Sequence, residues 1–244
     1  MDDKLLLYLH IPKTGGSSFT QTIMDNCPNT VHFYTLNNAA ELSESLIGAD
    51  ALCGHFIYGI HQFTEREYQY ATMLRHPLER TFSSFYFKYK NPAYMFSYNQ
   101  ELTFEEYVLN PYFDLEYCNL QARMISGEIT NPYPNYKTAR DRLKQHFAFF
   151  GITEQYEASL FLFAQKMNWE PKHYPKVNVT KVRPLDISLS KEAMKSVLLK
   201  NEIDHKLYKY AYRQFNERIL NLSFEQGQQL KTYLREGRKK TSQP

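Results

Sequence analysis

The 244-residue chain has little of what marks several protein classes. It contains only three cysteines, and because Cys27, Cys53 and Cys118 are far apart, they fit reduced thiols better than a disulfide framework or a metal cage. No apolar run approaches about eighteen residues, so we expect no membrane span. Lys and Arg outnumber Asp and Glu by only 29 to 26, which is too small an excess to predict nucleic acid as the main partner.

The first residues also lack the positively charged region of a signal peptide, because Asp2 and Asp3 stand there. We therefore expect a cytosolic protein, unless the chain is a catalytic domain cut from a longer one. The chain has no internal repeat, and its 43% hydrophobic and 23% charged residues are ordinary for a folded protein. We expect one domain over residues 1–244, with 235–244 as a frayed, solvated tail. Nothing in the sequence indicates an oligomeric state.

Short apolar runs alternate with segments of helical periodicity. Strands are predicted over residues 5–9, 51–53, 70–74 and 147–152. Helices are predicted from about 17 to 27, 39–47, 77–90, 154–167, 203–215 and 223–234, with helical pieces between 103 and 145 and a polar loop over 171–184. This alternation predicts an α/β fold with a central parallel sheet flanked by helices and ligands at the carboxyl ends of the strands.

One segment of the chain has the composition of a phosphate-binding loop. It runs from His10 to Ser18 and joins the first predicted strand to the first predicted helix. The first amides of a helix lack backbone partners and the helix dipole favours negative charge there, so an anion can bind at this point. The candidate binding residues, which supply a cation, hydroxyls and a backbone that a ligand can approach closely, are Pro12, Lys13, Thr14, Gly15, Gly16, Ser17 and Ser18.

A loop that binds a nucleoside triphosphate would need Gly-Lys-Ser/Thr at its helical end. Here Lys13 precedes the glycine pair, and no Gly-Lys dipeptide occurs anywhere in the chain. A P-loop kinase or nucleotide hydrolase therefore stays an alternative with the wrong residue order. A non-enzymatic glycan-binding protein, using the 16% of aromatic residues as stacking platforms, is a third reading that leaves Lys13 unexplained.

The sequence Pro-Lys-Thr-Gly-Gly-Ser-Ser after a short strand resembles the 5′-phosphosulfate loop of sulfotransferases that use 3′-phosphoadenosine 5′-phosphosulfate (PAPS). It looks most like the carbohydrate branch that includes heparan sulfate 2-O-sulfotransferase. A second element is similar too: a strand that ends in Arg75, then Pro77, and Ser83 eight residues after the arginine. The resemblance implies that Arg75 and Ser83 bind the 3′-phosphate of the donor, as a forked guanidinium can. His76 departs from the family, where Asp is common.

The resemblance extends to further segments, over residues 119–127, 150–154 and 178–181. In relatives the late basic loop closes over the nucleotide, which makes Thr180 and Lys181 donor-binding candidates. A Gly-His pair after a buried strand supplies the catalytic base in relatives, and His55 stands at this place after Gly54. An imidazole that titrates near neutral pH suits this role. The resemblance thus implies that the protein transfers a sulfuryl group from PAPS to a hydroxyl, and that the acceptor is a carbohydrate.

Sulfuryl transfer asks a protein mainly to align the acceptor with the donor and to neutralise the charge that develops on the leaving phosphate. We expect Lys13 to stabilise the departing phosphate and His55 to remove the acceptor's proton. His61 and Arg123 are weaker candidates for contact with the acceptor. We expect no metal, because neither cysteine spacing nor a His-x-x-x-His pair accompanies His55 and His61.

Overall fold

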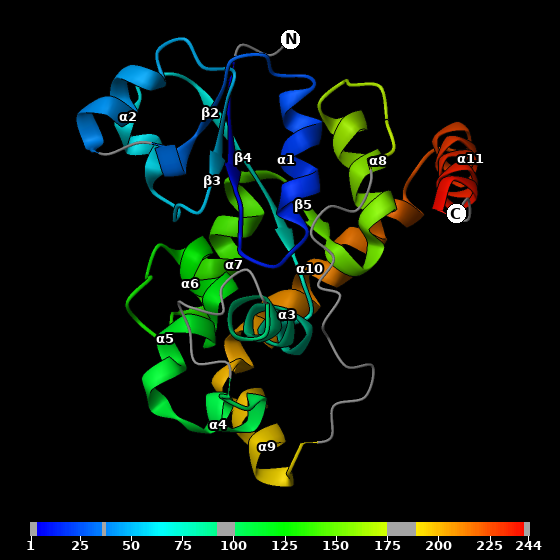
Figure 1. The fold of residues 1–244 in the computed structure, drawn as a ribbon. Coiled ribbons are helices and arrows are strands. Elements are labelled where there is room, and N and C mark those ends of the chain that lie inside the picture. Colours follow the sequence, from blue (N-terminus) through cyan, green and yellow to red (C-terminus); the bar gives the residue numbers. More distant parts are fainter. Residues whose placement is uncertain (1–3, 36–37, 92–100, 175–188, 242–244) are drawn as a thin grey trace.

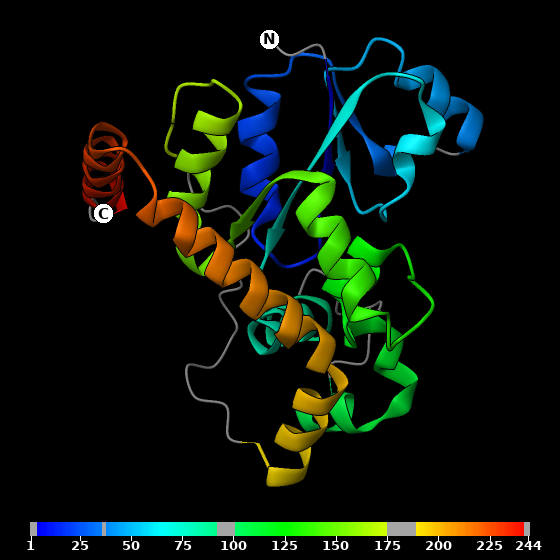
Figure 2. The same ribbon diagram turned by 180° about the vertical axis from the view of Figure 1, so that it is seen from behind.

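The apolar runs form one five-stranded sheet in the part of the chain that the computed structural model describes, residues 4–35, 38–91, 101–174 and 189–241 (Figures 1 and 2). The strands are β1 (Leu5–Leu9), β2 (Thr30–His32), β3 (Ala51–Gly54), β4 (Tyr68–Leu74) and β5 (Phe147–Ile152). Their order is β2-β3-β1-β4-β5, and every neighbouring pair is parallel. This confirms the predicted α/β class.

The strand order gives the sheet a topological switch point at the carboxyl ends of β1 and β4, and the region between the two loops there is called the crevice below. From β1 the chain proceeds to the sheet edge at β2, whereas from β4 it proceeds to the opposite edge at β5. Because the two connections leave in opposite directions, the loops after these neighbouring strands separate, and this is where open α/β sheets bind their ligands. The loops in question hold Lys13 and Arg75.

Helices cover both faces of the sheet, as Figures 1 and 2 show from opposite sides. α1 (Gly16–Met24) and α8 (Tyr156–Lys166) lie on one face, and α7 (Tyr136–Gln145) lies on the other. The remaining helices are α2 (Ala39–Ser45), α3 (Pro77–Tyr89), α4 (Phe104–Leu109), α5 (Asp114–Tyr117), α6 (Leu120–Ser126), α9 (Lys191–Lys200), α10 (Glu202–Leu220) and α11 (Phe224–Thr241). Short 3₁₀ turns include η1 (Phe33–Thr35) and η2 (Ile60–Phe63).

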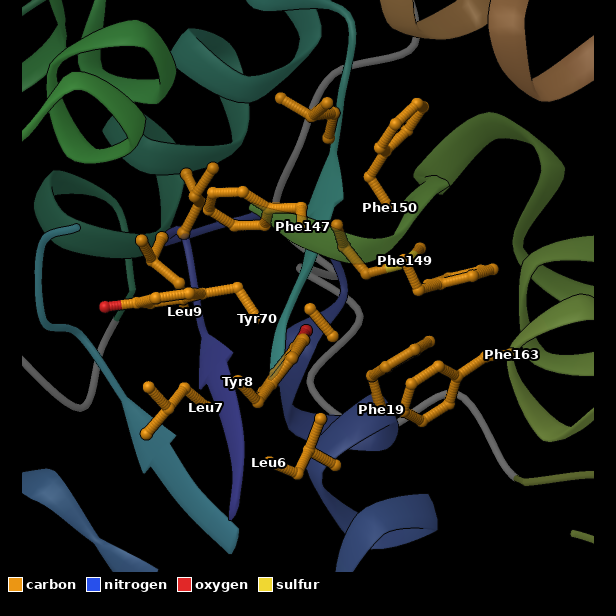
Figure 3. Close-up of a cluster of buried hydrophobic side chains, with 14 of the residues drawn as sticks. Leu6, Leu7, Tyr8, Leu9, Phe19, Tyr70, Phe147, Phe149, Phe150 and Phe163 are labelled. Atoms are coloured by element: carbon orange, nitrogen blue, oxygen red, sulfur yellow. The ribbon is translucent and has the colours of Figure 1, made fainter. Parts of the chain in front are cut away.

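The core has two layers because successive side chains of a strand point to opposite faces. Figure 3 shows both layers around β1. The layer on the side of α1 and α8 includes Tyr8, Phe19, Phe149 and Phe163. The layer on the other side includes Leu7, Leu9, Tyr70 and Phe147. The sheet is therefore buried on both faces, as a parallel sheet requires.

A second apolar cluster lies beyond the carboxyl edge of the sheet, where α3, α4, α5 and α9 pack together in the lower part of Figure 1. Its buried members are Phe82, Phe85, Tyr89, Phe104, Tyr107, Val108, Tyr117, Cys118, Ala193 and Val197. The cluster fixes α3 on the side of the sheet where the loops after β1 and β4 lie. All three cysteines are buried and free of disulfides.

The structure differs from the sequence-based expectation at three elements. Strand β2 was not expected, because it has only three residues and all are half-buried at the sheet edge. Helix α9 was also missed, although the Ser190 side chain caps it by accepting from the amide of Ala193 at 3.1 Å. Helix α11 also continues to Thr241, through residues that were expected to be frayed, and Gly237 packs against His173. None of the described helices has the length and apolarity that a membrane span needs.

Candidate functional site

The loop after β1 has a defined backbone shape. Lys13 and Gly15 both adopt left-handed backbone conformations, with φ of 69° and 83°. The buried Thr14 hydroxyl donates to the carbonyl of Ile11 at 2.8 Å, which closes the turn. A Cβ on Gly16 would lie 2.0 Å from Cδ2 and Nε2 of His10, so any larger residue at the start of α1 would force the His10 ring to move. The loop therefore directs the first amides of α1 toward the crevice. The N-cap residue, Gly15, has no side chain that could bond them.

Lys13 lies half-buried in this crevice. Its Nζ is 3.7 Å from the ring centroid of Phe87 on α3, which is a cation–π contact. Burial and, secondarily, repulsion by Arg75 lower the pKa of Lys13 to about 8. The ammonium is thus poorly solvated and lies near a second cation. A bound anion would relieve both effects.

Arg75 follows β4 and reaches across to the loop after β1. Its Nη1 donates to the carbonyl of Lys13 at 3.1 Å, and its Nη2 lies 3.5 Å from Oε2 of Glu79. The side chain of Thr153, directly after β5, joins the same two loops. Its hydroxyl lies 2.7 Å from the carbonyl of Thr14 and 3.0 Å from that of Leu74. The structure therefore brings Lys13 and Arg75 together at the switch point of the sheet.

Ser83 lies on the side of α3 that faces this crevice. It is buried, and it stands four residues before Phe87, whose ring contacts Lys13. Because residues four apart are neighbours on a helix surface, Ser83 and Phe87 share one face of α3. Ser17 at the start of α1 is exposed and Ser18 is buried. The predicted phosphate-binding residues before residue 175 thus gather around one end of the sheet.

His55 lies on the neighbouring side of β1. Residues Leu9 and Gly54 pair in register, so His55 emerges beside the start of the Lys13 loop. Its Nδ1 is 2.7 Å from the carbonyl of His10. A carbonyl can only accept a hydrogen bond, so Nδ1 carries the proton, and in the neutral ring Nε2 is left with a free lone pair. The side chain of His55 is exposed, as a base that meets an external substrate must be.

The ring of His10 packs beside that of His55, with centroids 4.5 Å apart. Burial, followed by the nearby His55 and Lys13, lowers the pKa of His10 to about 3. His10 is therefore neutral at physiological pH. Sequence reasoning placed His10 in the loop motif but gave it no role, because its contact with His55 joins two separate strands.

The structure does not bring every candidate to the crevice. The Nδ1 atom of His61 lies 2.9 Å from the hydroxyl of Tyr70, and its ring stacks on Tyr68, at the amino end of β4. Arg123 is buried and donates to the backbone carbonyls of Leu115, Cys118 and Ile129. Neither side chain is placed to meet an acceptor at His55. Thr180 and Lys181 lie outside the described residues.

Two further side chains hold the loop after β4. Gln121 on α6 bonds the backbone of Arg75, and Glu154 accepts from the amide of His76 at 2.8 Å. Sequence reasoning noted their segments only as similar to a family and gave neither residue a role. Within the described ranges, no three His, Cys, Asp or Glu side chains gather in a group that could hold a metal ion.

Comparison with known protein families gives a match over most of the chain. A family model described as the sulfotransferase family matches residues 1–211, which include β1 to β5 and both loops of the crevice. The end of α10 and all of α11 lie beyond the matched residues. A search of curated proteins gave no significant match.

Proposed function

The chain belongs to the sulfotransferase family, and we propose that it transfers a sulfuryl group from PAPS to a hydroxyl of a carbohydrate acceptor. The observation that carries this proposal is the meeting of Lys13 and Arg75 at the carboxyl ends of β1 and β4, with Nη1 of Arg75 3.1 Å from the carbonyl of Lys13. Two cations from separate loops suit a ligand with two separate phosphate groups. PAPS is such a ligand.

The residues of the crevice fit this donor. Lys13 and the first amides of α1 would hold the 5′-phosphosulfate, because the helix dipole and the ammonium act at the same point. Arg75 and Ser83 would hold the 3′-phosphate, and Thr180 and Lys181 stay candidates for the nucleotide. The lowered pKa of Lys13 supports this assignment, because a cation without its full hydration gains more from an anion than an exposed lysine would.

The transfer needs a proton acceptor and a stabilised leaving group. The Nε2 atom of His55 would take the proton of the acceptor hydroxyl while its oxygen forms the new bond to sulfur. The bond between sulfur and the 5′-phosphate oxygen breaks, and its electron pair stays on that oxygen. Lys13 would stabilise the charge that develops there. The His10 carbonyl would remain bonded to the Nδ1 proton and so stabilise the imidazolium of His55.

The acceptor would approach His55 from the side of β2, because the proposed donor site lies on the other side of β1. On that side, η1 packs directly against Gly54, where an added Cβ would lie 2.5 Å from the Cβ of Phe33. The next residue, Tyr34, has a 71% exposed side chain, whose ring lies 5.2 Å from that of His32. An exposed aromatic ring on the β2 side of the sheet is a surface on which a sugar ring can stack.

Calorimetric titration separates this proposal from the alternatives. The protein should bind 3′-phosphoadenosine 5′-phosphate, the desulfated donor, without magnesium and more tightly than magnesium-ATP or AMP. Arg75→Ala should abolish that preference, whereas Arg213→Ala, which removes a 70% exposed arginine paired with Glu217, should not. Preference for magnesium-ATP would favour a kinase or hydrolase, and sugar binding indifferent to the nucleotide would favour a glycan-binding protein.

Variants of the two catalytic candidates complete the test. Lys13→Ala should weaken nucleotide binding and abolish turnover. His55→Asn keeps a side-chain amide that can donate to the His10 carbonyl but has no basic nitrogen, so it should bind the nucleotide normally and lose turnover. Rates like those of the unmodified protein in both variants would contradict the site assignment.

A further inference from the structure

The peptide groups around Arg75 are held by side chains rather than by neighbouring strands. The amide of Arg75 donates to Oε1 of Gln121 at 2.9 Å, and Nε2 of Gln121 donates to the carbonyl of Arg75 at 2.9 Å. The amide of the next residue, His76, donates to Oε1 of Glu154 at 2.8 Å. Three consecutive backbone groups are thus bonded by two side chains from distant parts of the chain.

These bonds replace strand pairing where it ends. The pairing of β4 with β1 ends at Thr72, and its pairing with β5 ends at Leu74. Helix α3 begins only at Pro77. The carbonyl of His76 accepts from the amide of Arg80 in α3 at 2.9 Å, but without Gln121 and Glu154 the amide and carbonyl of Arg75 and the amide of His76 would lose the bonds described above. The direction in which Arg75 leaves the backbone would then vary.

Gln121 is itself held by an exchange of caps between two helices. The amides of Gln121 and Ala122 at the start of α6 donate to the carboxylate of Asp204 on α10 at 3.2 and 2.7 Å. In return, Oδ1 of Asn119 accepts from the amides of Ile203 and Asp204 at the start of α10, at 2.9 and 3.0 Å. All the side chains that make these bonds are fully buried. The network fixes α6, and with it Gln121, relative to α10.

Helix α10 also holds the second side chain. The hydroxyl of Tyr208 donates to Oε2 of Glu154 at 2.9 Å, while Oε1 of the same carboxylate accepts from His76. Asp204 and Tyr208 are four residues apart, so they lie on one face of α10. One helix face therefore supports both Gln121 and Glu154.

We propose that Gln121 and Glu154, supported by α10, are positioning residues that fix the direction of Arg75 and thereby give the site its selectivity for a ligand with a second phosphate. The inference rests on the proposed donor site. A guanidinium can bond two phosphate oxygens at once only when its plane has a fixed orientation. In the structure, Nη1 of Arg75 donates to the carbonyl of Lys13. Side chains that orient a binding group are as necessary to recognition as the group itself.

The test compares two nucleotides that differ by one phosphate. Dissociation constants of 3′-phosphoadenosine 5′-phosphate and AMP are measured for the full chain and for Gln121→Met, which has similar length but forms neither bond to Arg75. The preference is expressed as the dissociation constant of AMP divided by that of 3′-phosphoadenosine 5′-phosphate. This ratio should fall by about tenfold in Gln121→Met, the order expected when an orienting partner is lost. AMP binding, which does not need the second phosphate contact, should be unchanged. All titrations are run well below the unfolding temperature of each variant.

Two milder variants and one control keep the test independent of folding. Tyr208→Phe removes only the hydroxyl that fixes Glu154, so it should lower the ratio by a smaller factor than Gln121→Met. Glu154→Gln keeps an oxygen acceptor for His76 and should retain most of the preference. Gln165→Met, at a glutamine whose bond to Gln229 is exposed, should leave the ratio unchanged.

The possible outcomes separate the two proposals. A protein that prefers the doubly phosphorylated nucleotide, together with a Gln121→Met variant that has lost this preference, supports the inference. An unchanged ratio in Gln121→Met, or an equal loss for both nucleotides, overturns it while leaving the donor assignment intact. If the unmodified protein itself shows no preference for the second phosphate, the donor assignment and the inference both fail.

Discussion

Raising the pH from 7 to 9 should weaken nucleotide binding through Lys13 alone. Burial and the nearby Arg75 lower the pKa of Lys13 to about 8, and the ammonium is the form that attracts phosphate. Nucleotide binding should therefore be strongest below this pKa and become weaker as the pH rises through it. For a pKa of about 8, the charged fraction falls from about nine-tenths at pH 7 to about one-tenth at pH 9. The dissociation constant of 3′-phosphoadenosine 5′-phosphate should accordingly rise by about tenfold over this range.

The assay is calorimetric titration at several pH values in buffers of equal ionic strength. The phosphates of the ligand are ionised throughout this range, because their second pKa is about 6. Lys13→Arg provides the matched control, since its guanidinium stays charged to beyond pH 12 and its binding should not vary with pH. Constant affinity in the unmodified protein, or an equal decline in Lys13→Arg, would refute the reasoning.

Three further predictions concern other parts of the structure. Gly16→Ala should lower the unfolding temperature because its methyl group would lie 2.0 Å from two ring atoms of His10, whereas Gly48→Ala, with open space around it, should not. Asp204→Asn should cost about 3 kcal/mol in the urea unfolding free energy, because the amides of Gln121 and Ala122 bond different carboxylate oxygens and one of these oxygens becomes an NH2 group that cannot accept; a change below about 0.5 kcal/mol would contradict the capping role. Tyr34→Ala should raise the KM for a carbohydrate acceptor by about fivefold or more and leave donor binding unchanged, because the lost ring contact is worth about 1 kcal/mol. An unchanged KM would exclude Tyr34 from the acceptor site.

Much of the fold followed from local patterns. The runs that became β1, β3 and β5 are short, apolar and bounded by turn residues, so their strands were predicted within one residue of the observed bounds. Pro77 correctly predicted the start of α3. The weaker predictions were at the edges, where β2 has three half-buried residues and α9 buries only two side chains. There the local signal is small, and contacts with the rest of the fold determine the element.

The candidate site residues also divide into those that local sequence could place and those that it could not. Arg75 and His55 each follow a strand directly and Lys13 lies in the loop after β1, so the order of strands and loops was enough to place them at one edge of the sheet. Arg123 and His61 had no such anchor in the sequence, and the structure places Arg123 among backbone carbonyls and His61 at the amino end of β4. Being charged or titratable did not by itself indicate which end of the sheet a residue would occupy.

The sequence by itself determined the strand-loop-helix units and the cations that they carry, because such units depend on residues that are close along the chain. Tertiary structure alone decided which buried polar groups hold these loops in place. Gln121 meets Arg75 across 46 residues, Glu154 meets His76 across 78, and Asp204 meets Ala122 across 82. A buried hydrogen-bonding group must find a partner, but its identity depends on how distant segments pack, and local sequence contains no record of that.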